Sequence, residues 1–391
     1  MKTSVAEAVV FPRPVTADGQ PDPLLCELVR DDPVLAVVGP GGAPAWLVGR
    51  HDLVYEVLSD PSRFSNVIDP PIPNSRANMA LLDPPEHTRL RRLAAQAFTA
   101  RRVRALVPGI RHIVNSLLDD IELAGSPLDL VEFLARPLPG QVICQILGIP
   151  EGDRADLQRW ANMFTAMTTY SPDEIDRAVG EMQAYMNRLV TTRRRNLGDD
   201  VLSNLIRAGD GRDALSEEEL IATILLLLVA GTETTMKAIT RGVMILSWSG
   251  QLAGLADGAI PVEQVVEEVL RHQAPIDTSL FRWAKADTEL AGARIEAGDQ
   301  LFVSLHLANF DGHARTDPHV FDPSRGHAGH LSFGHGVHFC LGAALARAEL
   351  AAVFEGLATR FPGLRLDTTV AELTWSVGSM LNAPTSLPVA W

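Results

Sequence analysis

Along most of the chain, apolar residues recur every three to four positions, the spacing that is typical of amphipathic helices. Strand-like patterns are confined to short stretches. Residues 34–38 and 45–48 predict two strands joined by the turn 39–42, and residues 289–303 predict a hairpin around Gly292 and Gly298. Helices are expected over 21–30, 51–58, 103–124, 138–147, 154–167, 172–195, 217–249, 262–272 and 343–359, with another that begins at 82–87. The pattern therefore predicts a mainly α-helical chain with small β-sheets.

The helix expected over 217–249 is unusually long. Ser216 and Glu219 form a capping-box pattern at its start, and Gly250 is a typical stop signal. Its first half is apolar on all sides, which predicts a helix that crosses the interior. Residues 230–235, however, read Ala-Gly-Thr-Glu-Thr-Thr, and glycine and threonine are poor helix formers. Because sequences depart from local rules mainly at functional sites, we expect such a site here.

The composition indicates one domain with a large core. The 391 residues are 46% hydrophobic and contain no repeat or long linker, so we expect a single domain over 1–391. Cys26, Cys144 and Cys340 are far apart and odd in number, which favours a reducing compartment over a disulfide framework. The N-terminus lacks a signal-peptide pattern, and the apolar run 220–230 is shorter than the ~20 residues that span a bilayer. We therefore expect a cytoplasmic protein without a membrane anchor.

The net charge of −14 argues against a nucleic-acid partner. The charge is uneven, because residues 87–118 include seven arginines and no acidic residue. The arginines are Arg89, Arg91, Arg92, Arg101, Arg102, Arg104 and Arg111. Such a run is either a solvated helix face or a docking surface for an acidic partner.

Residues 333–342 read Phe-Gly-His-Gly-Val-His-Phe-Cys-Leu-Gly and directly precede a predicted helix. The glycines permit tight turns and a close approach of the backbone to a flat ligand. Cys340 lies just ahead of the helix N-terminus, where unpaired N–H groups and the helix dipole favour a thiolate. Two other interpretations are a buried core cysteine and a zinc site. The zinc site would use His327, His330, His335 and His338, whose spacing differs from that of paired zinc ligands.

This segment resembles the haem-binding loop of the cytochrome P-450 superfamily, with every constrained position of that signature filled. The resemblance implies haem b as the cofactor, Cys340 as the axial ligand of the iron, and His338 as a contact of a haem propionate. Further haem contacts are implied at His87, Arg91, Ala230, Arg282, Phe333, Gly334 and Gly342. Glu268, Arg271 and Arg325 resemble the family's buried Glu-x-x-Arg network, which supports the cysteine loop from behind.

Residues 230–235 resemble the family's oxygen-activation motif, an acid–alcohol pair in a distorted helix. Glu233 and Thr234 fall on the acid and the alcohol. From the residues alone, the alternative is a threonine that bonds back to its own helix, with Glu233 on a solvent-facing side. The helix face of Thr234 and the family's pocket segments together predict a substrate pocket. Its expected lining is Thr223, Leu226, Leu227, Ala230, Ile276, Leu280, Met380 and Leu381.

The resemblance covers nearly the whole chain and implies the cytochrome P-450 fold, with a long central helix over the haem. It implies a haem-thiolate monooxygenase that inserts one oxygen atom from O₂ into a bulky, mostly apolar organic substrate, with natural products as the expected class. Electrons are expected from NAD(P)H through a ferredoxin reductase and a ferredoxin, and we expect a monomer. A peroxide-driven haem-thiolate enzyme and a non-catalytic haem sensor stay open as alternatives. One departure from the family is Phe310, where relatives often carry Arg.

Overall fold

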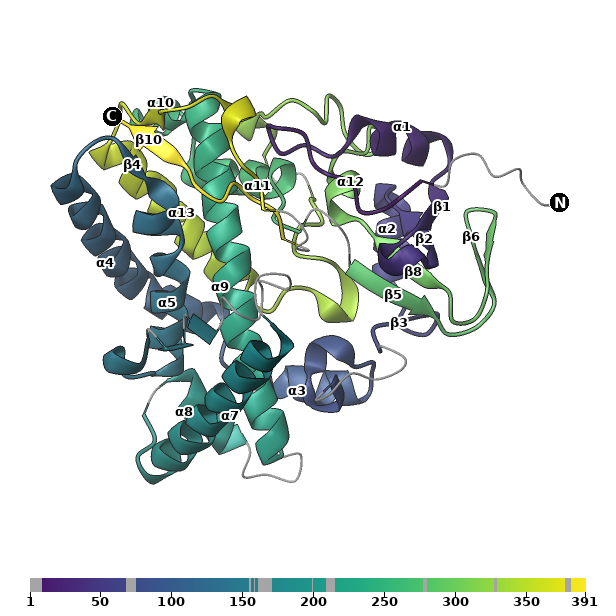
Figure 1. Cartoon of the computed structure of the whole chain (residues 1–391), viewed down its shortest axis with the longest axis horizontal. Coiled ribbons are helices and arrows are strands. Elements are labelled where there is room, and N and C mark those ends of the chain that lie inside the picture. Colours follow the sequence, from purple (N-terminus) through teal and green to yellow (C-terminus); the bar gives the residue numbers. More distant parts are fainter. Residues whose placement is uncertain are drawn as a thin grey trace.

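The structure is a computed structural model that describes residues 9–67, 75–154, 156–157, 159–160, 171–198, 200–208, 215–276, 280–326, 329–376 and 381–391. The described part is mainly helical, with most of its strands gathered at one end (Figure 1). Its helices are α1 (Pro23–Asp31), α2 (His51–Ser59), α3 (Glu86–Ala95), α4 (Ala100–Ala124), α5 (Pro137–Leu147), α7 (Pro172–Arg195), α8 (Val201–Ala208), α9 (Glu217–Trp248), α10 (Gln251–Ala256), α11 (Val262–His272), α12 (Leu305–Asn309) and α13 (Ala343–Arg360). Its strands are β1 (Val34–Val38), β2 (Pro44–Val48), β3 (Phe64–Ser65), β4 (Leu128–Asp129), β5 (Leu280–Ala284), β6 (Thr288–Leu290), β7 (Ala293–Ile295), β8 (Gln300–Val303), β9 (Arg365–Leu366) and β10 (Pro388–Ala390).

The predicted fold class is confirmed, and most expected helices are present within about three residues of their predicted ends. The expected helix 154–167 lies largely outside the described residues. The helices α8, α10 and α12 were not expected, because elements of five to eight residues are too short to show a clear helical period.

The hairpin expected over 289–303 is only partly correct. β6 and β7 pair around a turn in which Ala291 and Gly292 both have positive φ. β8 leaves this hairpin and pairs with β2 and β5 instead. The reason is burial, because Leu301, Phe302 and Val303 are at most 1% exposed and need both faces covered.

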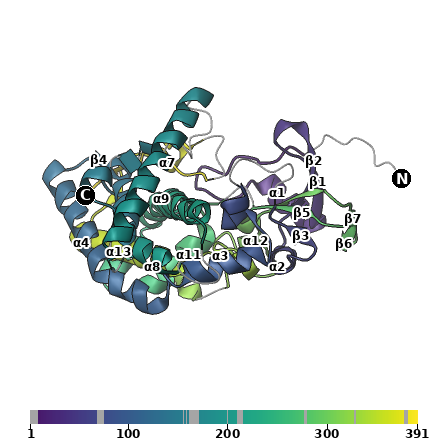
Figure 2. The same ribbon diagram turned by 90° about the horizontal axis from the view of Figure 1, so that it is seen from below.

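Helix α9 runs through the middle of the helical part and is seen almost end-on in Figure 2. The capping box is present, because Ser216 and Glu219 each accept a hydrogen bond from the other's backbone N–H. Helices α5, α11 and α13 pack against α9. Gly242 allows α13 to pack closely against α9, because a Cβ there would lie 2.5 Å from the Phe354 ring of α13. By length and composition α9 could cross a membrane. However, 56% of its apolar 18-residue stretch is buried within the protein, as in a core helix.

The main sheet has the strand order β1-β2-β8-β5-β3, and only the β2–β8 pair is parallel. In Figure 1 it lies at the opposite end of the molecule from α4, beside α1, α2 and α12. β1 and β2 form the predicted hairpin, with Val34 opposite Val48. A second sheet, β4-β10-β9, fixes the C-terminal segment to the helical part. Both the sheet and the helices contribute to the cavity described next.

Candidate active site

A cavity of about 370 Å³ lies between α9 and the segment 333–342, which we call the cysteine loop. Helices α3, α5 and α13 and strand β5 also contribute to its wall. The structure brings together thirteen of the predicted site residues in this wall. They are His87, Arg91, Leu226, Leu227, Ala230, Thr234, Ile276, Leu280, Phe333, Gly334, His338, Cys340 and Gly342.

Glycines and backbone hydrogen bonds hold the cysteine loop. Gly334 and Gly336 have positive φ, of 67° and 69°. A Cβ at Gly336 would collide with the backbone carbonyl of Leu58 in α2, so the close approach of loop and helix requires glycine. The Cys340 N–H donates to the Phe333 carbonyl oxygen at 2.8 Å, which folds the loop back on itself.

Cys340 is exposed where it faces the cavity. Burial by the surrounding protein raises the pKa of its thiol, although the backbone N–H of Gly342 and the charges of Arg91 and Arg347 act to lower it. In the protein without haem, burial of Cys340 thus outweighs the contacts that favour its thiolate, including those at the helix N-terminus. A coordinating metal ion deprotonates a thiol outright and would supply the missing stabilisation.

His87 and His338 form a pair in the cavity wall, with ring centroids 4.0 Å apart. Among the described residues, His87 Nδ1 and His338 Nε2 are buried and have no hydrogen-bond partner. Burial and the neighbouring positive groups lower the pKa of His87 and bring that of His338 to about 3. Both rings are therefore neutral at neutral pH, and each can donate one N–H to an anionic group in the cavity.

The two arginines that were predicted to contact the haem, Arg91 and Arg282, lie in different places relative to the cavity. Arg91 lines the cavity and donates from Nη2 to the carbonyl oxygen of Phe339. Arg282 lies in the middle of β5, is 4% exposed, and donates to its neighbour Phe281 at 2.7 Å. It is absent from the cavity wall as described, although its charge contributes to the low pKa of His338. Burial brings the pKa of Arg282 down to about 10, so it remains a cation beside the histidine pair at neutral pH.

The acid–alcohol motif lies inside a continuous helix, so the expected distortion of α9 is absent. Thr234 lines the cavity, and its Oγ1 donates to the Ala230 carbonyl oxygen at 2.6 Å. One part of the alternative is therefore present, because Thr234 bonds back to its own helix. The other part is wrong, because Glu233 is only 6% exposed and does not face solvent. Glu233 lies about 100° further around the helix and outside the cavity wall. Gly231 is explained by packing, since a Cβ there would lie 3.3 Å from Ile143 of α5.

Two of the expected pocket residues lie outside the wall. Thr223 is buried at 2% exposure but is three helical turns, or about 16 Å, from Thr234. Leu381 forms an isolated bridge with Ile276 and therefore stands behind the wall. Helical periodicity identified the correct face of α9 but could not show where the cavity ends. Met380 lies outside the described residues.

The predicted Glu268–Arg271–Arg325 network is present. Arg271 donates to both carboxylate oxygens of Glu268 at 2.8 Å, and both residues are buried. Arg325 Nε lies 3.6 Å from Glu268 and its other nitrogens donate to the carbonyls of Thr316 and Asp317. Together these contacts hold the chain segment that precedes the cysteine loop.

A second network was not predicted. Glu267 accepts from Arg347 of α13 at 2.5 and 2.9 Å and pairs with His330 at 3.2 Å. Asn309, also fully buried, donates to Ser332 at 2.8 Å and accepts from the Leu331 N–H at 2.8 Å. These contacts join residues that are 22 to 80 positions apart, so no local pattern in the sequence could reveal them.

Among the ionisable residues of the cavity wall, Glu349 of α13 is the one that the sequence reasoning missed. It follows Leu345 by four positions and precedes Val353 by four, so it interrupts an apolar helix face. That interruption was the available signal.

The residues present fit a haem group. The wall combines a sulfur donor on a glycine-bound loop, two neutral histidines with unpaired nitrogen atoms, an adjacent arginine and mostly apolar side chains. For the zinc alternative, His327 lies outside the described residues, and the remaining described residues contain no cluster of three or more His, Cys, Asp or Glu suited to a metal ion.

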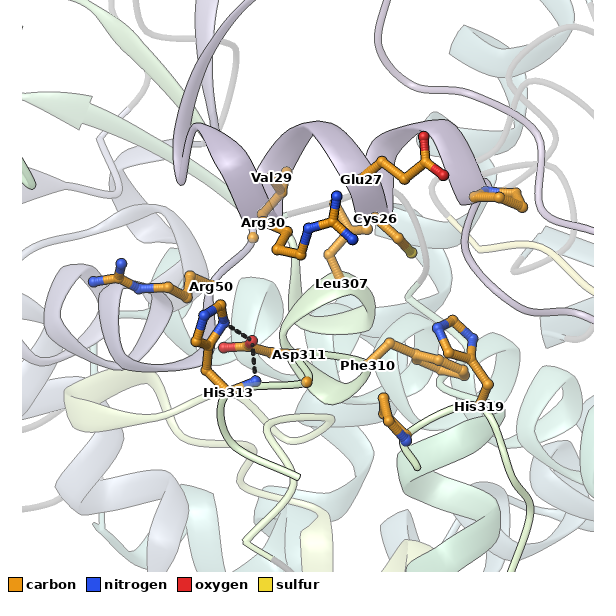
Figure 3. A pocket seen from close by; sticks show the side chains of 14 residues that line it. Cys26, Glu27, Val29, Arg30, Arg50, Leu307, Phe310, Asp311, His313 and His319 are labelled. Carbon is orange, nitrogen blue, oxygen red and sulfur yellow. Dashed lines mark hydrogen bonds and ion pairs between the residues drawn. The ribbon is translucent and has the colours of Figure 1, made fainter. Parts of the chain in front are cut away.

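A second cavity, of about 590 Å³, lies between α1 and the end of α12 (Figure 3). Phe310 lies in its wall and packs against His319 with ring centroids 5.3 Å apart. Asp311 accepts from the backbone N–H groups of His51 and His313 at 3.0 and 2.9 Å. Asp311 therefore already has hydrogen-bond partners within this cavity wall.

Comparison with known proteins agrees with this site. The cytochrome P450 family model matches residues 33–247 and 261–378. The chain is 41% identical to nocardicin C N-oxygenase of Nocardia uniformis subsp. tsuyamanensis, over 97% of this chain and 98% of that protein. It is 40% identical to mycinamicin IV hydroxylase/epoxidase of Micromonospora griseorubida, over 93% and 94% of the two chains.

Solved structures show the same similarity. The cytochrome P450 hydroxylase from the leinamycin biosynthetic pathway of Streptomyces atroolivaceus superposes with a TM-score of 0.90 at 38% identity, covering 98% of this chain and 100% of that one. The match of family model, sequence and fold over nearly the whole chain shows that this protein belongs to the cytochrome P450 family of haem-dependent monooxygenases.

Proposed function

We propose that this enzyme oxygenates a bulky, mostly apolar natural product. We propose further that a ferredoxin reductase and a ferredoxin deliver the electrons from NAD(P)H. The observation that carries the proposal is a single cavity with Cys340 in one wall, Thr234 in another and apolar side chains between them. Cofactor chemistry, an alcohol group and room for an organic substrate are thereby combined in one place.

Haem bound through a thiolate supplies the oxygen chemistry, in which the O–O bond is cleaved with two electrons and two protons. The protein's part is to bind and orient. Cys340 would hold the iron, and His87, His338 and Arg91 would donate N–H groups to the haem carboxylates. The charge of Arg282, which also acts on His338, would add to the attraction for these anionic groups.

Thr234 would hold protons near the reacting oxygen. Its hydroxyl hydrogen is directed to the Ala230 carbonyl, so its lone pairs are available to a water molecule in the cavity. Rotation about the Cβ–Oγ1 bond would turn the hydroxyl hydrogen from the Ala230 carbonyl toward the cavity. Glu233, the preceding residue of α9, is buried and would pass protons from solvent water toward Thr234.

The substrate class is inferred from the side chains that surround the space beside Thr234. They are Met79, Phe98, Ile143, Leu226, Leu227, Ile276 and Leu280. Such a wall favours a large apolar skeleton and offers few fixed polar contacts. Relatives named for nocardicin C and mycinamicin IV support a natural product as the class of substrate.

The two alternatives predict different behaviour. A peroxide-driven enzyme has no need of an alcohol in the cavity wall, whereas Thr234 lies there. A non-catalytic sensor would bind haem but would not couple electron input to product.

The decisive experiment compares the wild type with Cys340→Ser. The reduced carbonyl complex of the wild type should show the red-shifted Soret band that gives the family its name, and the variant should lose it. Cys26→Ser, far from the cavity, is the matched control. Product that depends on O₂ and NAD(P)H with added ferredoxin and reductase supports the proposal, and product only with peroxide would replace it.

A further inference from the structure

Arg241 of α9 is an arginine in the core of the protein, with 0% of its surface exposed. It follows Thr234 by seven positions, which is about two helical turns, so the two residues lie on nearly the same face of α9. Ala238, between them, contributes to the cavity wall, whereas Arg241 lies outside that wall. Burying a guanidinium group is costly unless its N–H groups are hydrogen-bonded. The contacts of Arg241 therefore indicate its role.

Arg241 connects α9 with three other parts of the chain. Its Nε donates to Gln273 Oε1, just after α11, at 3.1 Å, and its Nη1 donates to the Asn382 carbonyl oxygen at 3.1 Å. Its Nη2 donates to the carbonyl oxygen of Gly19. The guanidinium carbon also lies 5.2 Å from the centroid of the Trp375 ring. The planar fork of N–H groups allows one arginine to hold several segments in a fixed arrangement.

Two of these contacts reach the cavity wall. Gln273 is three positions before Ile276, which lines the cavity. Asn382 directly follows Leu381, which forms an antiparallel bridge with Ile276. Arg241 thus holds both the chain that leads into this part of the wall and the segment that pairs with it. Because α9 forms another side of the cavity, these contacts fix the spacing between the two sides.

The C-terminal contacts act on a pair of segments rather than on one residue. Residues 374–376 and 381–385 run antiparallel and are joined by backbone hydrogen bonds. Arg241 contacts both of them, one at the Trp375 ring and the other at the Asn382 carbonyl oxygen. A displacement of the guanidinium would therefore move the two segments together.

The third contact is with the N-terminal turn, residues 16–20. Gln273 donates from Nε2 to the Asp18 carbonyl oxygen of this turn at 2.9 Å. Gly19 has a φ of 81°, and a Cβ there would lie 2.5 Å from Gln273 Oε1 and 2.9 Å from the Trp375 ring. The turn therefore fits closely over the same cluster of side chains and requires glycine at this position.

We infer that Arg241 is a positioning residue for the substrate. Through its three contacts it sets the place of the cavity wall at Ile276 relative to Thr234. Among the described residues, the N-terminal turn contributes nothing to the cavity wall, yet by this route it affects the fit of the substrate. The inference rests on the proposed monooxygenase function for the identity of the ligand, since any apolar ligand bound beside the haem iron would meet the same wall.

The first test measures local structure in the haem-loaded protein. Backbone hydrogen exchange should become faster at residues 273–276 and 381–385 in Arg241→Met, which keeps a long side chain but removes the N–H groups. Arg193→Met is the matched control, since Arg193 of α7 also donates to a backbone carbonyl, that of Gly148, and lies outside the cavity wall. An equal rise throughout the chain of Arg241→Met would indicate a general loss of stability and would overturn the inference.

The second test measures the fit of a ligand and needs no turnover. Imidazole binds haem iron through a ring nitrogen, and 4-phenylimidazole adds an apolar ring that has to fit against the wall. Titration of the Soret band gives the Kd of each. In Arg241→Met we expect the Kd of 4-phenylimidazole to rise about tenfold, at the lower end of the ~10-fold to ~200-fold effect of one methylene in an apolar pocket. The Kd of imidazole should stay nearly unchanged, because imidazole is too small to depend on this wall.

Gly19→Ala tests the N-terminal turn while Arg241 remains in place. It should also weaken the binding of 4-phenylimidazole, because the added Cβ displaces Gln273 and Trp375. Gly41→Ala is its control, since Gly41 has a φ of 75° and, in the described part of the chain, no atom within 4 Å of an added Cβ. Both affinities should be unchanged in this control. Arg241→Lys, which retains a donor, should recover part of the affinity that Arg241→Met loses.

Wild-type affinity for 4-phenylimidazole in both Arg241→Met and Gly19→Ala would overturn the inference and leave Arg241 with a stabilising role only. A parallel loss of both azoles would also overturn it, because the defect would then lie at the haem rather than at the wall. If Arg241→Met takes up no haem, Arg241→Lys and Gly19→Ala carry the test with the same criteria.

Failure of the proposed function is a separate result. A wild type that binds both azoles but makes no product with O₂ and electrons would refute the monooxygenase activity. The ratio of the two azole affinities in the variants would still decide whether Arg241 positions the wall.

Discussion

At the scale of single residues, the chemistry of this site depends on which polar atoms are already satisfied. Thr232 and Thr234 make the same bond to their own helix, to the Leu228 and Ala230 carbonyls, each at 2.6 Å. Only Thr234 also faces the cavity, while Thr232 is 1% exposed and packed in the core. Two residues of identical chemistry thus have different roles because of their positions around one helix.

Thr234→Ala should uncouple electron consumption from product formation. We expect the ratio of hydrogen peroxide to product per NAD(P)H to rise at least about tenfold, in the range of effects of a positioned proton donor. The substrate-induced spin shift, measured in parallel, controls for binding. Thr232→Ala removes the same helix back-bond outside the cavity and should remain coupled. Equal behaviour of the two variants would make Thr234 a packing residue.

At the scale of elements, the cysteine loop is positioned by α2 on one side and by α11 and α13 on others. The contact with α2 depends on Gly336, and the contact between α11 and α13 depends on Glu267 and Arg347. Arg347 also lies over the Phe333 ring, 4.5 Å from its centroid. The loop geometry is therefore a property of three helices rather than of the motif alone.

Gly336→Ala should destabilise the loop more than its backbone angle explains. A left-handed conformation costs a residue with a Cβ about 1–2 kcal/mol. Gly292, in the β6–β7 turn, has a φ of 85° and no atom within 4 Å of an added Cβ, so Gly292→Ala should show this cost alone. Gly336→Ala adds the collision with Leu58 and should also lower haem content. Thermal unfolding and the haem-to-protein ratio of both variants test this, and equal losses would contradict it.

Glu267 should contribute to stability at acid pH. Burial acts to raise its pKa, but the hydrogen bonds from Arg347 and His330 outweigh this and bring the pKa from 4.5 to about 2. Because the folded-state pKa is lowered, the contribution is present above about pH 4.5 and is lost as pH falls toward 2. Its size is on the order of 3 kcal/mol.

Glu267→Gln should therefore lower the free energy of unfolding at neutral pH and flatten its dependence on pH between about 4.5 and 2. Urea unfolding at a series of pH values measures both effects. Glu355→Gln, which removes a surface ion pair with Arg111, should change stability by less than about 1 kcal/mol. If the free energy of unfolding of Glu267→Gln falls as steeply at acid pH as that of the wild type, groups other than Glu267 control the pH dependence.

At the scale of the whole molecule, an acidic protein carries a basic surface beside the cysteine loop. Arg91 of α3 contacts Phe339, which is 41% exposed and directly precedes Cys340. Arg92, Arg101 and Arg104 are exposed on α3 and the start of α4. Arg89 is less available than expected, because it pairs with Glu219 of α9.

Charge reversal at Arg101 and Arg104 should slow reduction of the enzyme by an acidic ferredoxin and flatten the dependence of that rate on salt. Stopped-flow reduction at several ionic strengths measures both. Reversal at Arg30 and Arg294, which lie on α1 and β7 at the sheet end of the molecule (Figure 2), is the control with the same change in net charge. Equal effects of the two double variants would place the docking surface elsewhere.

The sequence by itself determined the elements and the residue types of the site. Helical periodicity and capping residues located α9 and α11, since both depend on residues within a few positions of one another. The cysteine loop and the pairing of Glu268 with Arg271 are equally local. The alternation of β1 and β2 around their turn was likewise sufficient to predict their pairing.

The tertiary structure alone decided which of these residues share a cavity and in what state. It places Thr234 in the cavity wall but Glu233 and Thr223 outside it. It also leaves Arg282 outside the wall, where its charge still acts on His338. It sets the burial of Cys340, which opposes the thiolate in the protein without haem, because desolvation depends on all neighbours rather than on the helix that follows. The partners of Glu267 and the isolation of Glu349 arise from contacts across several helices. The burial of a residue and its distance from other residues depend on the packing of the whole chain, so a local sequence pattern cannot reveal them.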